Sequence, residues 1–174
     1  KLTTWRSTAE QAVDAAVERL PEALTRRLAG CRTKGTPLAG LAPRDLGTRL
    51  RAAHRLEPAV AAGMARRLGA LAWPAVDLAR GGSELRPLRP GLDLCAAELR
   101  AHCRWGAVLH LEDLLLRRVR LGMWEPATAV GLLNTVRPIV RRELGWGFKR
   151  WQQERERFAR ALEGWTVGGV RNEE

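Results

Sequence analysis

Asp113 and Arg117 are the first side chains in this sequence whose types and spacing suggest an interaction. They stand four residues apart, and a carboxylate and a guanidinium at i and i+4 share a helix face and can form an ion pair. Apolar side chains recur around them at helical spacing, at Leu111, Leu114, Leu115 and Leu121. The pair either lies in solvent on an amphipathic helix or ties neighbouring helices together, and the spacing is compatible with both.

The cysteines and histidines form no pattern typical of a metal site or a nucleophile. Cys31, Cys95 and Cys103 include no CxxC pair, which favours a reduced, intracellular protein. If Cys95 and His110 belong to one helix, its rise separates them by about 22 Å, too far for two zinc ligands. No dinucleotide-binding glycine motif, P-loop, metalloprotease motif or nucleophile elbow occurs. We therefore expect neither a metal site nor an evident active site in this chain.

The composition predicts a helical protein. Ala, Leu, Arg and Glu are abundant, Tyr is absent and β-branched residues are sparse, which argues against a sheet. No run of 18 apolar residues is present, so no membrane-spanning helix is expected. Arg6, Glu10 and Asp14 interrupt any segment that could resemble a signal peptide. The predicted fold is an all-α, multi-helix bundle of about six to seven helices around a long central helix.

Apolar spacing and the positions of Gly and Pro predict the elements. In order, they are a helix from Thr3 or Thr4 to about Leu28, kinked or restarted at Pro21; a loop over 30–43; short helices over 44–55, 59–69 and 73–79; a turn-rich linker over 80–91; the central helix over 93–121; a helix over 126–144 that contains Pro138; and a last helix over 148–162.

Two of these helices have a predicted buried face. The first helix is expected to bury Trp5, Ala9, Ala12, Val13, Ala16, Val17 and Leu20. The last helix is expected to place Trp151, Arg155, Phe158 and Leu162 on one side and a solvated, charged surface on the other.

The formal net charge is +11, and apart from Lys1, Lys34 and Lys149 the basic residues are arginines. Such a charge attracts nucleic acid, acidic lipid or an acidic protein face, although arginine excess also follows from a GC-rich coding sequence. Short helices followed by a basic loop also fit a helix-turn-helix module. A free-standing basic helical module that binds nucleic acid or an acidic protein is therefore the alternative hypothesis.

Several short motifs follow one another in a characteristic order. They are Lys1-Leu-Thr-Thr-Trp-Arg6 with Ala9-Glu10, then Thr36-Pro-Leu-Ala-Gly40, then Glu98 and His110-Leu-Glu-Asp-Leu-Leu-Leu-Arg-Arg118, and finally Glu143-Leu-Gly-Trp146. This ordered set resembles the FAD-dependent glycerol-3-phosphate dehydrogenases and the related glycerophosphate oxidases. Three positions depart from the family pattern: Trp5 stands for a tyrosine, and Ala101 and Gly106 stand for an aromatic residue and a glutamate.

The resemblance implies a domain organisation and an activity. Residues 1–30 would be the last helix of a truncated flavin-binding domain, 31–43 a linker and 44–166 a helical C-terminal domain. The residues of 167–174 themselves predict a disordered tail. The parent enzyme would oxidise sn-glycerol 3-phosphate to dihydroxyacetone phosphate, with electrons passing through FAD to a quinone. The fragment alone would neither hold FAD nor catalyse the reaction.

The resemblance also implies roles for individual residues. Lys1 would lie near the flavin and the substrate phosphate, and Leu2 and Thr3 would offer backbone groups to the flavin ring at a helix N-terminus that favours negative charge. A structural network would contain Glu98, Asp113, Arg117 and Arg118.

Partners and location follow from the same resemblance. The flavin-binding domain of the same chain would be the main partner, and nucleic acid is not expected. A homodimer and a peripheral contact of the basic face with the inner side of the cytoplasmic membrane are compatible with the resemblance, and the location would be cytoplasmic.

Overall fold

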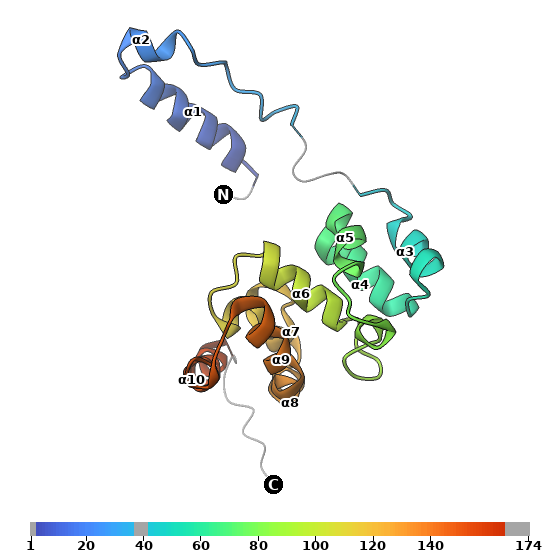
Figure 1. Cartoon of the computed structure of the whole chain (residues 1–174). Coiled ribbons are helices and arrows are strands. Elements are labelled where there is room, and N and C mark those ends of the chain that lie inside the picture. The colour runs from blue at the N-terminus through green and yellow to red at the C-terminus, as the bar shows by residue number, and fades with distance from the viewer. Residues whose placement is uncertain (1–2, 37–41, 166–174) are drawn as a thin grey trace. The chain divides into compact units, whose positions relative to one another are not determined.

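The computed structural model describes residues 3–36 and 42–165 of the 174-residue chain. Those residues form ten α-helices and no strand, so the predicted all-α class is confirmed (Figure 1). No helix in these two ranges combines the length and the apolar character needed to cross a bilayer. The chain divides into two compact units, 1–41 and 42–174. The predicted tail lies outside the described residues.

The first unit contains two helices where the sequence predicted one long element. Helix α1 spans Trp5–Val17 and α2 spans Glu22–Thr25. Pro21 precedes α2 as its N-cap, so the restart at Pro21, one of the two predicted alternatives, is the one that forms. The predicted buried face of α1 is wrong for this structure, because no residue of α1 is buried and Val13 is 60% exposed. Its apolar side chains have too few partners within the first unit to leave water.

The second unit begins with three short helices that agree with the prediction. They are α3 (Leu46–His54), α4 (Pro58–Leu68) and α5 (Ala72–Val76). Helix α3 ends at Arg55, which has a φ of 53°, and α4 starts with Pro58, a residue preorganised for the first helical turn. A 3₁₀ turn within the predicted linker spans Gly82–Leu85.

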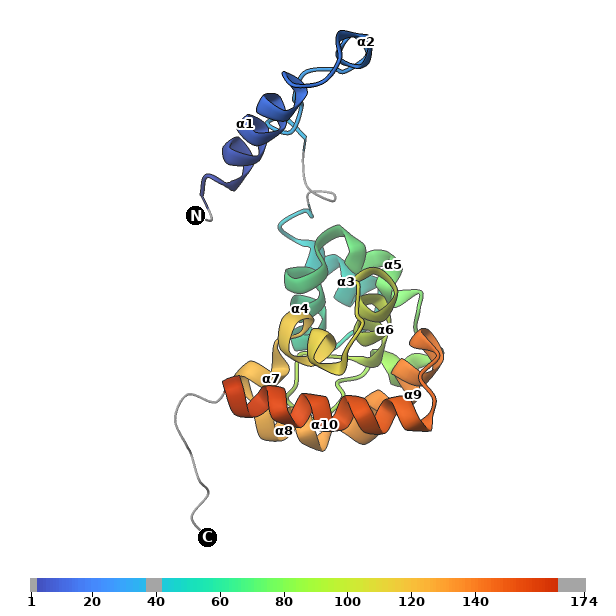
Figure 2. The same cartoon turned by 90° about the vertical axis from the view of Figure 1, so that its left-hand side faces the viewer.

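Helix α6 (Ala96–Trp105) contributes side chains to two hydrophobic clusters. Figures 1 and 2 show its backbone among the helices of the second unit from two directions. Every residue from Ala96 to Cys103 is buried. Ala97 and Ala101 contact the cluster formed with α3, α4 and α5, whereas Leu99 contacts the cluster formed with the later helices. Two-sided burial makes α6 the central element, although it is much shorter than predicted.

The predicted central helix over 93–121 is wrong as a continuous element. Helix α6 ends at Gly106, and Ala107 then takes a left-handed conformation with a φ of 49°. Helical structure resumes at Leu111 and widens into a π-helical turn, Asp113–Arg118, in which the N–H of Val119 donates to the carbonyl of Leu114 at 3.0 Å. A second left-handed residue, Arg120, precedes α7 (Leu121–Trp124).

Three further helices complete the second unit. They are α8 (Pro126–Gly131), α9 (Leu133–Leu144) and α10 (Phe148–Trp165). The predicted helix over 126–144 is therefore divided at Leu132, while Pro138 lies inside α9. On α10, Trp151, Phe158 and Leu162 are buried as predicted, but Glu154 replaces Arg155 on the buried side.

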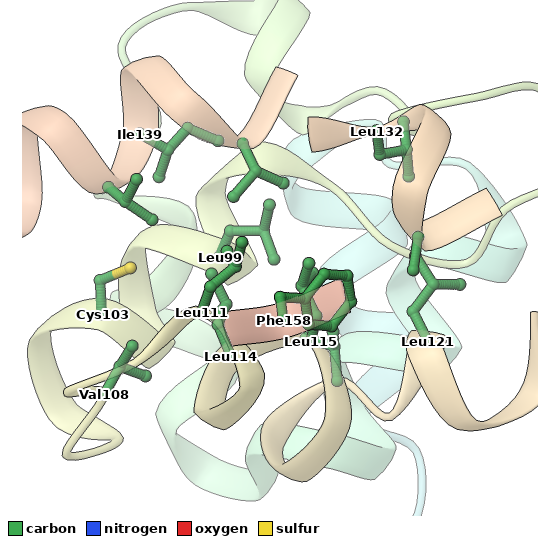
Figure 3. Close-up of a cluster of buried hydrophobic side chains, with 14 of the residues drawn as sticks. Leu99, Cys103, Val108, Leu111, Leu114, Leu115, Leu121, Leu132, Ile139 and Phe158 are labelled. Carbon is green, nitrogen blue, oxygen red and sulfur yellow. The ribbon is translucent and has the colours of Figure 1, made fainter. Parts of the chain in front are cut away.

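The larger hydrophobic cluster joins the π-helical turn to α6, α9 and α10 (Figure 3). Leu114, Leu115 and Leu116 are all buried, and the Phe158 ring of α10 is 1% exposed among these leucines. Burial of such side chains contributes roughly 1.5–3 kcal/mol each. This packing holds the turn and the ends of α6 in place.

We predict that Phe158→Ala lowers the free energy of unfolding by about 3–5 kcal/mol, because it removes a fully buried ring and leaves a cavity. Phe148→Ala on the same helix should cost less than about 1 kcal/mol, since the Phe148 ring is 67% exposed and contacts only Arg137 by a cation–π interaction among the contacts described. Chemical denaturation followed by circular dichroism measures both. Equal losses would contradict the packing described.

Candidate functional site

The predicted flavin-facing residues stand at the start of the chain. Lys1 and Leu2 lie outside the described residues, and Thr3 is exposed just before α1. Thr4 is the N-cap of α1 but its side chain forms no capping hydrogen bond. The first-turn N–H groups of α1 therefore have no side-chain cap, which is compatible with an anionic partner at this end. The roles assigned to these three residues stay predictions.

Glu98, the first residue of the predicted network, is completely buried in α6. Its carboxylate accepts hydrogen bonds from Nε and Nη2 of Arg67 in α4, at 2.5 and 2.8 Å. Arg67 also donates to a carboxylate oxygen and the carbonyl of Asp93, at 3.0 and 2.6 Å. Burial opposes the charge on Arg67, but Glu98 and Asp93 outweigh it and raise the pKa of the guanidinium. The bidentate Arg67–Glu98 pair ties α4 to α6.

Gly63 of α4 makes this connection sterically feasible. A Cβ on Gly63 would lie 2.6 Å from an Arg67 nitrogen and closer still to the Asp93 carbonyl oxygen. Because backbone cannot yield as a flexible side chain does, any larger residue would push the segment before α6 away from α4.

A second ionic network on α6 involves Arg100, which is 4% exposed. Arg100 donates to both Glu84 oxygens, at 2.6 and 2.9 Å, and to Glu143 at 2.5 Å. Arg104 donates to the other Glu143 oxygen at 2.6 Å. Burial raises the pKa of Glu143, but hydrogen bonds from Arg104 and Arg100 outweigh it and hold that pKa below its ordinary value. The network joins the 82–85 turn and α9 to α6.

Asp113 and Arg117 form the expected pair, at 2.8 Å between Oδ1 and Nη1. The other Asp113 oxygen accepts the backbone N–H groups of Leu109 and His110, at 3.0 and 2.8 Å. Burial opposes the charge, but these hydrogen bonds and Arg117 hold the pKa of Asp113 below its usual value. Asp113 therefore anchors the start of its own segment.

Glu112 and Arg118, which adjoin Asp113 and Arg117 in sequence, link this segment to other elements. Glu112 pairs with Arg117 at 2.9 Å and with Arg157 of α10 at 3.4 Å. Arg118 donates from Nε to the carbonyl of Gly106 at 2.5 Å, which ties the π-helical turn to the end of α6. A Cβ at Gly106 would lie 3.2 Å from that Nε, so the absence of a side chain at 106 leaves room for Arg118.

Glu154 is a buried polar residue that the sequence reasoning missed. It accepts the N–H of Leu111 at 2.9 Å and lies 2.9 Å from Nδ1 of His110 and 2.8 Å from Arg150. A period of 3.6 residues allows either 154 or 155 between Trp151 and Phe158, so the pattern alone could not choose.

An arginine-lined cavity of about 630 Å³ opens between α4, the segment before α6, and α7. It is lined by Arg66, Arg67, Leu92, Asp93, His102, Arg117, Arg118, Val119, Arg120, Leu121, Trp124 and Glu125. The predicted residues Arg117 and Arg118 are among these, whereas Glu98 and Asp113 do not line the cavity. The three arginines within 117–120 are recognisable in the sequence as a basic cluster. Their proximity to Arg66 and Arg67 could not be predicted, because it depends on contacts between segments far apart in sequence.

The two buried cysteines of the second unit are not activated nucleophiles. Burial raises the pKa of the Cys95 thiol to about 11 and that of Cys103 to about 12, so both remain protonated at neutral pH. Across residues 3–36 and 42–165, no three His, Cys, Asp or Glu side chains gather so as to hold a metal ion. The arrangement is suited to binding anions.

We predict that Gly63→Ala destabilises the protein by about 1–3 kcal/mol, because the added methyl collides with the Asp93 backbone and displaces the Arg67–Glu98 pair. Gly47→Ala is the matched control in α3, where a Cβ would meet atoms only at 3.5 Å or beyond. That change should be neutral or stabilising by up to about 1 kcal/mol, as expected for glycine replaced in a helix. Urea denaturation of both variants checks this, and an unaffected Gly63→Ala protein would contradict it.

Comparison with known proteins places most of the second unit in one family. The family model for the C-terminal domain of alpha-glycerophosphate oxidase matches residues 31–151. No curated protein and no solved structure matched the chain. The matched region contains all the ionic networks centred on α6 and ends within α10, whereas α1 precedes it. The chain therefore belongs to the glycerol-3-phosphate oxidase and dehydrogenase family, whose parent enzymes are FAD-dependent oxidoreductases, and residues 31–151 correspond to its C-terminal domain.

Proposed function

We propose that this chain is the C-terminal region of an FAD-dependent enzyme that oxidises sn-glycerol 3-phosphate to dihydroxyacetone phosphate and passes electrons to a quinone. The family match over residues 31–151 is the observation that carries this proposal. In it, the helical unit supports the flavin-binding domain of the same protein and supplies no reacting group of its own. The protonated, buried thiols of Cys95 and Cys103 are consistent with a supporting role.

Helix α1 would be the element that joins the helical unit to the flavin-binding domain. Trp5 and Val13 are 55% and 60% exposed, and with Leu28 they line a largely apolar groove of about 740 Å³ within the first unit. Exposed apolar surface of this extent marks an interaction site. The flavin-binding domain is its proposed occupant, because α1 precedes the matched C-terminal domain and its sequence resembles the end of the flavin domain.

Lys1, Leu2 and Thr3 are the proposed contribution of this chain to the active site. Bound FAD would supply the hydride acceptor. The Lys1 ammonium would attract the substrate phosphate, and the first N–H groups of α1, which have no side-chain cap, would favour negative charge nearby. The proposal also includes formation of a homodimer and a peripheral contact of the protein with the membrane.

The direct test uses the complete product of the source gene. It should contain FAD, seen by its visible absorbance, and reduce a quinone analogue in the presence of sn-glycerol 3-phosphate. A gene product without flavin, or one that shows salt-sensitive DNA binding at low micromolar concentration, would instead support a basic helical module.

We predict that Val13→Glu in the complete product lowers FAD content and activity at least about tenfold, since a charge on the apolar face of α1 opposes burial against the flavin-binding domain. Gln11→Glu adds the same charge to α1 but at a position outside the groove, and it should leave both unchanged. Equal effects of the two changes would argue against docking through this face.

We predict that Lys1→Gln lowers kcat/KM for sn-glycerol 3-phosphate by about ten- to a hundredfold, the usual effect of losing one charged hydrogen bond. Lys34→Gln removes the same charge from an exposed turn and should have little effect. Steady-state kinetics of both variants measures this, and unchanged kcat and KM in Lys1→Gln would remove the proposed role.

A further inference from the structure

The arginine-lined cavity contains positive charge that its carboxylates do not balance. Arg67 is paired with Glu98 and Asp93, and Arg117 is paired with Glu112 and Asp113.

The neighbouring arginines of the same wall differ from these. In the part of the chain that the structure describes, Arg118 and Arg120 take part in no ion pair, and Arg118 binds only the neutral carbonyl of Gly106 through its Nε. The carboxylate of Glu125, at the rim, is engaged by Arg89 and by the Thr128 hydroxyl. Two guanidinium groups two residues apart therefore line one cavity without carboxylate partners.

His102 of α6 is a further unusual residue in the wall of this cavity. Its ring lines the cavity and is 7% exposed, and its Nε2 is buried without a hydrogen-bond partner. The nearest carboxylate oxygen, Oε1 of Glu98, is 3.6 Å away, beyond hydrogen-bonding distance. Buried polar atoms nearly always have a partner, so an unpaired one needs an explanation.

We propose that this cavity binds an organic phosphate. Guanidinium groups bind phosphate oxygens through paired, charge-assisted hydrogen bonds, and Arg118 and Arg120 have donors to spare. A ligand at these arginines would also lie against the ring of His102, whose Nε2 faces Glu98.

The size and lining of the cavity fit more than an inorganic ion. About 630 Å³ is in the range of small-molecule sites, and Leu121 and Trp124 at the cavity give an apolar surface for the group attached to the phosphate. All of these residues belong to the second unit, so the inference does not depend on the flavin-binding role of the first.

The test is titration of the whole chain with phenyl phosphate at constant ionic strength, followed by calorimetry. Binding should be saturable, and Arg120→Gln should weaken it by about tenfold or more, the usual effect of one charged hydrogen bond. Arg118→Gln should do the same. Arg141→Gln is the matched control, because Arg141 is exposed on α9 outside the cavity, and it should bind as tightly as the wild type.

A second measurement reports on the site directly. In the protein labelled with ¹⁵N-histidine, the Nε2 resonance of His102 should shift on saturation with phenyl phosphate. The resonance of His54, which lies in α3 outside the cavity, should not shift. Absence of saturable binding, equal weakening by Arg120→Gln and Arg141→Gln, or an unmoved His102 resonance would each overturn the proposal.

A third measurement identifies the source of the phosphate. If it belongs to a lipid headgroup, phosphatidylglycerol vesicles should bind the chain, Arg120→Gln should abolish that binding, and phenyl phosphate should compete. If it belongs to a free metabolite, vesicles should not displace phenyl phosphate. Vesicle binding that is equally strong in wild type and Arg120→Gln, together with no phenyl phosphate binding, would overturn both.

Discussion

The Glu98 carboxylate, which has no exposure to solvent, is the constraint on which the helical unit depends. An unpaired charge at this depth would cost several kcal/mol, so its Arg67 partner must be held within hydrogen-bonding distance. Arg67 reaches Glu98 from α4 only because Gly63 lets the segment around Asp93 approach the α4 backbone. One buried carboxylate thereby fixes the spacing of α4, the preceding segment and α6.

The ionic networks and the two hydrophobic clusters have complementary roles around α6. The clusters supply most of the driving force for folding, but apolar contact is non-directional and leaves helices free to slide. The Arg100–Glu84–Glu143 network supplies directional contacts that choose one arrangement of α9 and the 82–85 turn against α6. This division explains why a helix so completely buried still contains Glu98 and Arg100.

The sequence was sufficient for the class of fold and for most helices, because period and composition are local properties. It was not sufficient for the turn after Trp105, because Gly106 is only a weak stop signal and an alanine at 107 does not predict a left-handed conformation. Nor could it give the partners of Glu98 and Arg100, which lie 31 and 43 residues away in Arg67 and Glu143. The arginine-lined cavity likewise forms from segments that only the tertiary structure brings together.

The π-helical turn at Asp113–Arg118 changes how this part of the chain should be aligned with its relatives. A wide turn accommodates one more residue than an α-helix between the same two anchor points, here the Asp113–His110 hydrogen bond and the Arg118–Gly106 contact. Three successive leucines, Leu114 to Leu116, can then all be buried. A relative that lacks the extra residue would need a gap within the leucine run, and without that gap every position on one side of the turn would be matched to one displaced by about 100° around the helix.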